Sequence, residues 1–151
     1  MYFQELPKDA RLWVYQANRV IAADEKVEIS SILNQFISKW AAHGIPLKGE
    51  ALVIKDRFII LGVDEKHEAA SGCSIDSSVK LIKDIGKKFN IDFFDRLNLI
   101  VEKDSEMKVI SFSELGNYSD CKIYNTLVNT VEQFNETFLI QVKESELYKL
   151  L

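Results

Sequence analysis

The sequence predicts an α+β fold, and within that class a ferredoxin-like βαββαβ sandwich with an extra strand and a C-terminal extension. Runs rich in β-branched and aromatic residues indicate strands, and two longer runs with apolar residues at helical spacing indicate helices. Their order is strand, helix, strand, strand, helix, strand, with one more strand appended. Two strand–helix–strand units interleaved through a hairpin form such a sandwich.

The first half of the chain is predicted to hold a strand, a helix and a hairpin. Residues 11–16 form the first strand, and Asp24 is the expected N-cap of the helix that follows. Gly44 and Pro46 are expected to end this helix. The runs 51–54 and 57–63 then predict a tight hairpin across Lys55-Asp56. The helix is recognised from apolar residues three and four positions apart: Ile29, Ile32, Leu33, Phe36, Ile37 and Trp40.

The second half begins with another amphipathic helix and a second hairpin. The runs 97–101 and 107–110 are expected to pair across residues 103–106. Beyond Ser113 the signals weaken: residues 122–130 are expected to be extended and residues 143–151 to form a short terminal helix. The apolar face of the second helix is predicted to hold Ile75, Val79, Ile82, Ile85 and Phe89.

This topology predicts which loops meet. We expect a four-stranded core in the order 4-1-3-2, with both main helices on one face. The exits of the first helix and the third strand then lie at one end of the sheet, and His43, His67 and Cys73 fall there. The opposite end collects three of the four arginines of the chain: Arg19, Arg57 and Arg96.

Length and composition predict one globular domain over residues 1–151, with a core at about 8–112 and the extension at 113–151. Hydrophobic content is 47% and charged content 28%, as in soluble proteins. No apolar run is long enough to cross a bilayer, and the N-terminus has no signal sequence, so no membrane is expected. Two cysteines favour a reducing cytoplasm, and a net charge of -4 argues against nucleic-acid binding.

The segment Ala69–Ser78 is the strongest candidate site. It places a glycine, a thiol, hydroxyls and a carboxylate where a helix presents unpaired N–H groups, which bind anions and acidify thiols. Cys73 could form a thiolate–imidazole pair with His43 or His67 as catalytic groups. The candidate ligand-binding residues of the segment are Ser71, Gly72, Ser74, Asp76 and Ser77.

Each of these residues also has a structural interpretation. Cys73 could be a small, inert packing residue after Gly72. Ser74 and Asp76 could be an N-cap and a first-turn acid, and His43 a helix C-terminal residue favoured by the helix dipole. The catalytic and structural interpretations differ in whether the Cys73 sulfur is accessible and within hydrogen-bond reach of a histidine.

The three arginines at the other end form a second candidate site. Arg19, Arg57 and Arg96 could clamp a carboxylate or phosphate, because guanidinium groups pair with such anions bidentately. The alternative is three separate ion pairs with neighbouring aspartates such as Asp56 and Asp95.

Several reaction classes are excluded by missing motifs. The chain has no Gly-x-x-x-x-Gly-Lys-[Ser/Thr] phosphate loop and no Gly-x-Gly-x-x-Gly dinucleotide fingerprint. Gly-x-Ser-x-Gly and Cys-x-x-Cys are absent as well. No zinc-type spacing of cysteine and histidine occurs, so neither a metal nor a cofactor is expected.

Four segments carry a resemblance to a known family: residues 40–44, 57–58, 63–65 and 70–79, of which the Ser-Gly-Cys-Ser motif is the most specific. With these residues the chain resembles a family of small, uncharacterised bacterial proteins often labelled "ABC transporter ATPase". The resemblance implies a shared fold over most of the chain. It implies no ATPase activity, because the phosphate loop is missing.

Together these observations predict a cytoplasmic domain that binds a small anionic ligand or a peptide at the His43/Ser71–Ser78 end. The alternative is a non-enzymatic interaction module that forms a homodimer through a sheet face or edge strand. A cysteine-dependent enzyme is a third interpretation.

Overall fold

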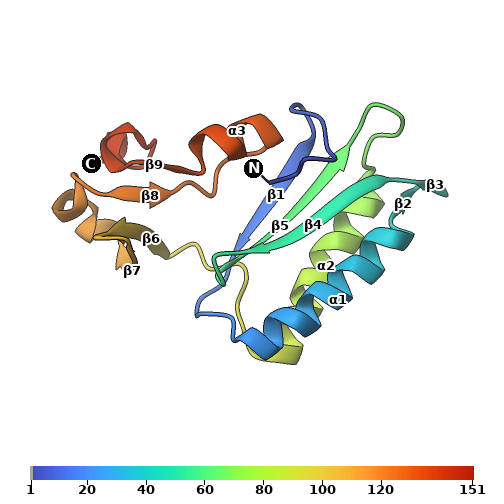
Figure 1. Ribbon diagram of the computed structural model, residues 1–151, viewed down its shortest axis with the longest axis horizontal. Helices are drawn as coiled ribbons and strands as arrows, with labels where there is room; N and C mark the ends of the chain where they lie inside the picture. Colours follow the sequence, from blue (N-terminus) through green and yellow to red (C-terminus); the bar gives the residue numbers. More distant parts are fainter. Residues whose placement is uncertain (1) are drawn as a thin grey trace.

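The structure, a computed structural model, describes residues 2–151 (Figure 1). It is an α+β fold, as predicted, with several antiparallel sheets. In chain order its helices and strands are β1 (Arg11–Gln16), α1 (Ala23–Lys39), β2 (Ala41–Ala42), β3 (Ile45–Pro46), β4 (Lys48–Ile54), β5 (Phe58–Asp64), α2 (Gly72–Phe89), β6 (Asn98–Lys103), β7 (Glu106–Ser111), β8 (Lys122–Tyr124), α3 (Val131–Thr137) and β9 (Leu139–Gln141).

The first sheet has three antiparallel strands in the order β1-β5-β4. β1 pairs with β5 from Arg11↔Val63 to Gln16↔Phe58, so the predicted neighbours are adjacent. The predicted hairpin between β4 and β5 is also present. Lys55 and Asp56 have φ values of 56° and 54°, because the turn that matches strand twist needs two left-handed residues.

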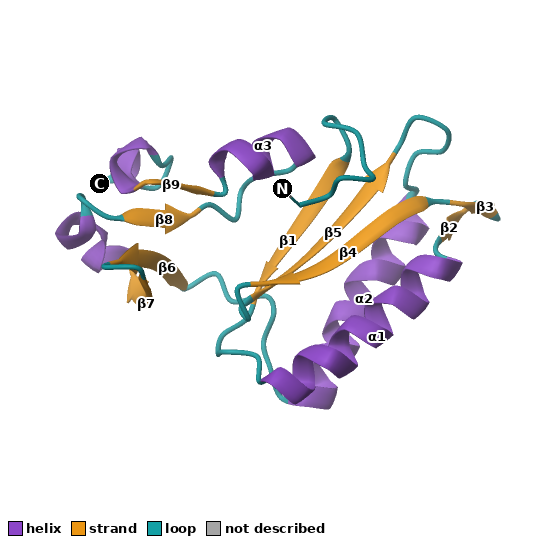
Figure 2. Ribbon diagram, viewed as in Figure 1, coloured by secondary structure: helices purple, strands orange, loops and turns teal. Residues whose placement is uncertain are grey.

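Both long helices cover one face of this sheet, as Figure 2 shows. Their apolar stripes supply Ile29 and Leu33 from α1, and Ile82 and Ile85 from α2. These side chains pack against Ile59 and its neighbours in β5. The helical periodicity seen in the sequence therefore marks the core-facing stripes correctly.

The fourth predicted strand departs from the expected topology. β6 belongs to a second sheet, in the order β7-β6-β8-β9, and does not pair with β1. The segment that leads into β6 meets the outer edge of β1 at an isolated bridge, Gln16↔Phe94, and then turns away. The Asp95 carboxylate holds this turn by accepting hydrogen bonds from the backbone N–H of Leu97 (3.1 Å) and Asn98 (3.3 Å). The order 4-1-3-2 is therefore incorrect at its fourth strand.

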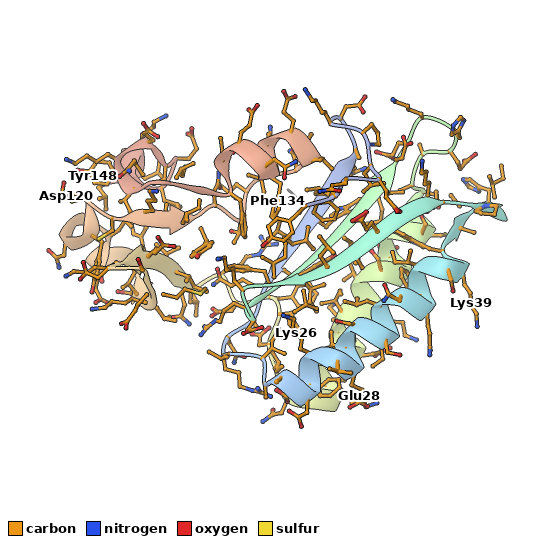
Figure 3. All side chains as sticks on the ribbon, viewed as in Figure 1. Lys26, Glu28, Lys39, Asp120, Phe134 and Tyr148 are labelled. Carbon is orange, nitrogen blue, oxygen red and sulfur yellow. The ribbon has the colours of Figure 1, made fainter. Side chains whose placement is uncertain are left out.

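The C-terminal extension covers the other face of the first sheet. Phe134 of α3 and Phe138, which follows α3, pack in one core cluster with Phe58 and Ile60 of β5 and with Ile100 of β6. Figure 3 shows Phe134 between α3 and the sheet. Because β5 is covered on both faces, all seven of its residues are buried, which explains its unbroken apolar sequence.

Several predicted boundaries need correction. α1 ends at Lys39, and His43 and Gly44 form the turn between β2 and β3, with φ values of 52° and 78°. The N-cap of α1 is Ala22, and Asp24 lies inside the first turn. Residues 143–151 hold only short 3₁₀ turns, and only residues 122–124 of the stretch 122–130 form a strand. Within residues 2–151, neither long helix combines the length and apolarity required to cross a bilayer.

Candidate functional site

The fold brings the predicted His43/Ser71–Ser78 end together. The Trp40 indole N–H donates a 2.9 Å hydrogen bond to the carbonyl of Ser74, which joins the end of α1 to the start of α2. Cys73, His43 and His67 are nevertheless all exposed. In the part of the chain that the structure describes, no hydrogen bond joins the Cys73 thiol to either histidine. Within residues 2–151, neither histidine is therefore placed as a base for a Cys73 nucleophile.

The polar residues of this segment are used by the helix itself. Ser71 is the N-cap of α2, and its hydroxyl accepts a 3.1 Å hydrogen bond from the Ser74 backbone N–H. The Ser74 hydroxyl donates back to the Ser71 carbonyl, and the Ser77 hydroxyl donates to the Cys73 carbonyl. Ser71 is therefore the N-cap, not Ser74. Gly72 and Asp76 are exposed, and Asp76 lies beyond the first turn.

The acidic loop before α2 is likewise occupied by its own backbone. The Asp64 carboxylate accepts a 3.0 Å hydrogen bond from the Lys66 N–H, and the Glu65 carboxylate accepts one of 2.8 Å from the Ala70 N–H. Among residues 2–151, no cluster of three histidine, cysteine or carboxylate side chains is arranged to hold a metal ion.

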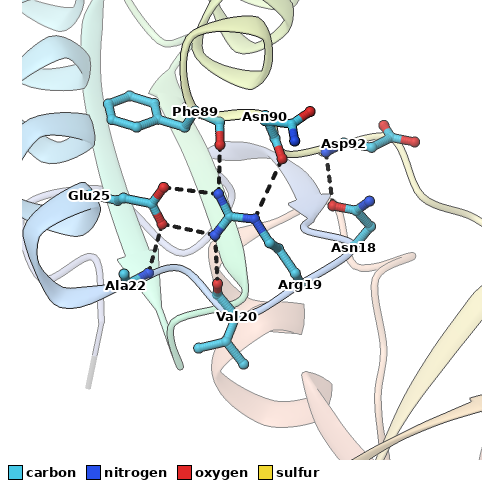
Figure 4. Close-up of polar contacts among 8 residues, drawn as sticks. All are labelled: Asn18, Arg19, Val20, Ala22, Glu25, Phe89, Asn90 and Asp92. Atoms are coloured by element: carbon cyan, nitrogen blue, oxygen red, sulfur yellow. Dashed lines mark hydrogen bonds and ion pairs between the residues drawn. The ribbon is translucent and has the colours of Figure 1, made fainter.

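At the opposite end, Arg19 is engaged by the protein (Figure 4). Two of its N–H groups form a bidentate pair with Glu25 at 2.9 Å each, and a third donates to the Val20 carbonyl. The remaining two donate to the carbonyls of Phe89 (2.6 Å) and Asn90 (3.4 Å) at the end of α2. A guanidinium has five N–H donors, so Arg19 has none left for a ligand.

The other two arginines do not complete an anion clamp with Arg19. Arg57 is buried, and one of its terminal nitrogens donates a long hydrogen bond of 3.4 Å to the Ala17 carbonyl. Burial lowers the pKa of the Arg57 guanidinium, and the nearby Asp95 carboxylate raises it. Arg96 is exposed at the turn into the second sheet. Each arginine therefore has its own environment.

The structure offers a different site, which sequence reasoning missed. A cavity of about 530 Å³ lies between the outer edge of β1 and the second sheet, within the size range of ligand pockets. Its walls come from segments far apart in sequence: residues 12–16, Val79, residues 93–96 and 98–99, residues 123–128, and residues 145–147. It occupies the space that the fourth strand of a ferredoxin-like sheet would fill.

The backbone of β1 faces this cavity with unpaired groups. Leu12 donates a 2.9 Å hydrogen bond to Asn129 on the outer side, and alternate residues of a strand point the same way, so Val14 also faces outward. Bridges to other segments occur at the ends of β1, at Arg11↔Thr130 and Gln16↔Phe94. Among residues 2–151, no backbone partner meets the N–H or C=O of Val14 between them.

Both side walls of the cavity are largely apolar. On the helix side, Tyr15 packs edge-to-face against Phe94, with ring centroids 5.5 Å apart. Burial raises the pKa of Tyr15 despite a hydrogen bond with Ser78. On the other side, burial and the neighbouring Glu102 raise the pKa of Tyr124 to about 12. Both phenols are therefore uncharged at neutral pH.

A second hollow, of about 640 Å³, follows the outer edge of β4 and is more open to solvent. It is lined by residues 2–5, by residues of α1 and by residues 50–53. Burial and the nearby Glu5 carboxylate raise the pKa of Glu50. This hollow thus combines a shallow surface with acidic groups, whereas the β1 cavity is deeper and bounded by apolar walls.

Comparisons of the chain with protein-family models, with curated proteins and with solved structures find no match.

Proposed function

We propose that this protein is a binding module that accepts an extended peptide along the free edge of β1. The observation that carries the proposal is the unpaired backbone of Val14 beside the 530 Å³ cavity. A peptide strand laid there would supply the missing hydrogen bonds, which is the mode called β-strand addition. The hydrogen-bonded ends of β1 would fix its position.

The chemistry of the cavity supports a peptide over a small anion. Its lining contains one arginine, Arg96, against the carboxylates of Asp95 and Glu146. An anion site would need several converging donors, whereas backbone groups between apolar walls suit a polypeptide. The peptide-binding function expected from the sequence is thus proposed at the β1 cavity instead of the His43/Ser71–Ser78 end.

The test replaces Val14 by proline. Proline removes the outward N–H, and it is tolerated on an edge strand where that N–H is not part of the sheet. The matched control is Val14→Ala, which keeps the N–H and removes only side-chain contacts. The probe is a capped hexapeptide, Lys-Val-Ile-Val-Ile-Lys, and its binding is followed by tryptophan fluorescence, because Trp13 lines the cavity.

We expect Val14→Pro to weaken peptide binding at least about tenfold, since a buried unpaired peptide group costs on the order of 1–3 kcal/mol. Val14→Ala should bind with a smaller loss. Circular dichroism and thermal unfolding establish that both variants are folded. Equal affinity of Val14→Pro and wild type would reject strand addition at β1.

A second candidate function is self-association through β4. Ala51 lies opposite Leu61, whose backbone groups pair with β1, so Ala51 faces the free outer edge of the sheet. Two copies could join these edges into one continuous sheet. Sedimentation analysis would detect the dimer, and Ala51→Pro should abolish it. A monomer at all accessible concentrations would exclude this candidate.

A further inference from the structure

Building on the proposed function, we infer that the peptide is an unbroken apolar run of about four residues with basic residues on each side. Such a segment differs from the usual edge-strand ligand, in which apolar and polar residues alternate. The inference follows from the two layers that enclose β1, the spacing of its end pairings and the charges at the rim of the cavity.

The apolar character follows from the position of the cavity between two layers. Its helix-side wall includes Trp13, Tyr15 and Phe94, and the opposite wall includes Leu99 and Tyr124. A strand next to β1 would therefore direct successive side chains into apolar surroundings on both faces. β5, on the inner side of β1, lies between the same two layers, and its run Phe58–Leu61 is apolar without interruption.

The length follows from the pairings at the ends of β1. Thr130 bridges Arg11, and Phe94 bridges Gln16, so a visiting strand can lie along residues 12–15, of which Leu12 already donates its N–H to Asn129. At about 3.3 Å per residue this gap spans roughly 13 Å, or four peptide residues. A longer bound segment has to leave the sheet at both ends, where its flanking residues reach the rim.

The expected charge of the residues on each side of the apolar run follows from the charged residues that line the cavity and from the net charge of the protein. Asp95, which holds its own turn, and Glu146, which pairs with Lys149 at 3.3 Å, outnumber Arg96 in the lining, and the protein carries a net charge of -4. Opposite charge on a ligand accelerates its association with the protein, and added salt weakens this attraction. Lysine or arginine beside the apolar run therefore complements this surface, whereas glutamate opposes it.

The experiment compares the affinities of three capped hexapeptides. Each is titrated into the protein while tryptophan fluorescence is recorded. Lys-Val-Ile-Val-Ile-Lys presents the unbroken run, Lys-Val-Ser-Val-Ser-Lys presents one apolar face, and Glu-Val-Ile-Val-Ile-Glu reverses the flanking charge. We expect the alternating peptide to bind at least about tenfold more weakly than the first, because it buries two fewer apolar side chains. The Glu-flanked peptide should also be weaker, and this difference should shrink with added salt.

The outcomes separate this inference from the proposed function. If the alternating or Glu-flanked peptide binds as tightly as the first, and Val14→Pro still abolishes binding, the inferred ligand chemistry is wrong and strand addition stands. If none of the peptides binds, the proposed function itself fails.

N-methylation of the peptide provides a test that needs no protein variant. In an added strand, alternate N–H groups point toward β1. Methylating the second or the third residue of the apolar run should therefore give unequal affinities, with one form near the parent and the other at least about tenfold weaker. Equal losses would contradict strand addition.

Discussion

Among single residues, Arg19 joins the start of one long helix to the end of the other. It bridges Glu25 in the first turn of α1 to the carbonyls of Phe89 and Asn90 at the end of α2 (Figure 4). The cation at a helix C-terminus and the anion at a helix N-terminus both have the favourable sign for the helix dipole. The carboxylate of Glu25 also accepts a 2.9 Å hydrogen bond from the Ala22 N–H.

This contact predicts a pH dependence of stability. The Arg19 hydrogen bonds, followed by that from Ala22, lower the pKa of Glu25 to about 2. A carboxyl group with a depressed folded-state pKa stabilises the fold above its unfolded pKa of about 4.3 and loses that contribution as pH falls toward 2. Glu25→Gln should therefore lower the melting temperature at pH 7, and the difference should shrink toward pH 2. A difference independent of pH over this range would contradict the assignment. Exposed Glu136→Gln is the control.

We predict that the Cys73 thiol is accessible to reagents and that neither histidine activates it. It is exposed at the start of α2, whereas Cys121 is half-buried, so an alkylating reagent should modify Cys73 first in the native protein. His43→Ala and His67→Ala should leave its rate unchanged, because neither imidazole hydrogen-bonds to the thiol in residues 2–151. A marked slowing in either variant, followed by mass spectrometry of each cysteine, would restore the catalytic interpretation.

Among the elements, α2 shows why two glycines in one helix have different roles. A Cβ built on Gly86 would lie 2.5 Å from the carbonyl oxygen of Ile91, a backbone atom fixed by the helix end. A Cβ on Gly72 meets nothing within 4 Å. The close approach of the chain after α2 thus depends on Gly86, while Gly72 has no packing requirement.

Gly86→Ala should therefore destabilise the protein by about 1–3 kcal/mol, as overpacking does. Gly72→Ala, the matched control in the same helix, should be neutral or stabilising by up to about 1 kcal/mol through the greater helix propensity of alanine. Chemical denaturation measures both. If Gly86→Ala leaves the free energy of unfolding unchanged, the segment that follows α2 can move away from the added methyl group without cost.

Elements defined by local signals were predictable from the sequence. The two long helices follow from apolar spacing, and the Lys55-Asp56 hairpin from two adjacent strand-like runs. The local signal at His43-Gly44 predicts a helix end, but residues with positive φ also form tight hairpin turns, as they do here. Helical periodicity predicts which face of each helix is buried. The positions of the helix ends depend instead on single residues such as Ala22, the N-cap of α1.

For the molecule as a whole, the sequence predicts the hairpin of β6 with β7 but not the second partner of β6. The sequence of β6 is compatible with pairing to β1, and the choice of β8 instead depends on residues 20 and 22 positions away, in the pairs Glu102↔Lys122 and Val101↔Ile123. The cavity is a consequence of that choice, because it lies where β6 is absent from the first sheet. Its lining comes from separate segments, none of which forms a motif by itself. The candidate site could therefore not be predicted from the sequence, although β1, the strand that borders it, could.

Hydrogen exchange at the Val14 amide is the most direct test of peptide binding at β1. In the free protein this N–H should exchange much faster than that of Leu12, which donates to Asn129. Saturation with Lys-Val-Ile-Val-Ile-Lys should slow exchange at Val14 by at least about tenfold, while the amide of Ala51 at the other sheet edge stays unchanged. Binding of the peptide without protection of Val14, or equal protection at Ala51, would contradict strand addition at β1.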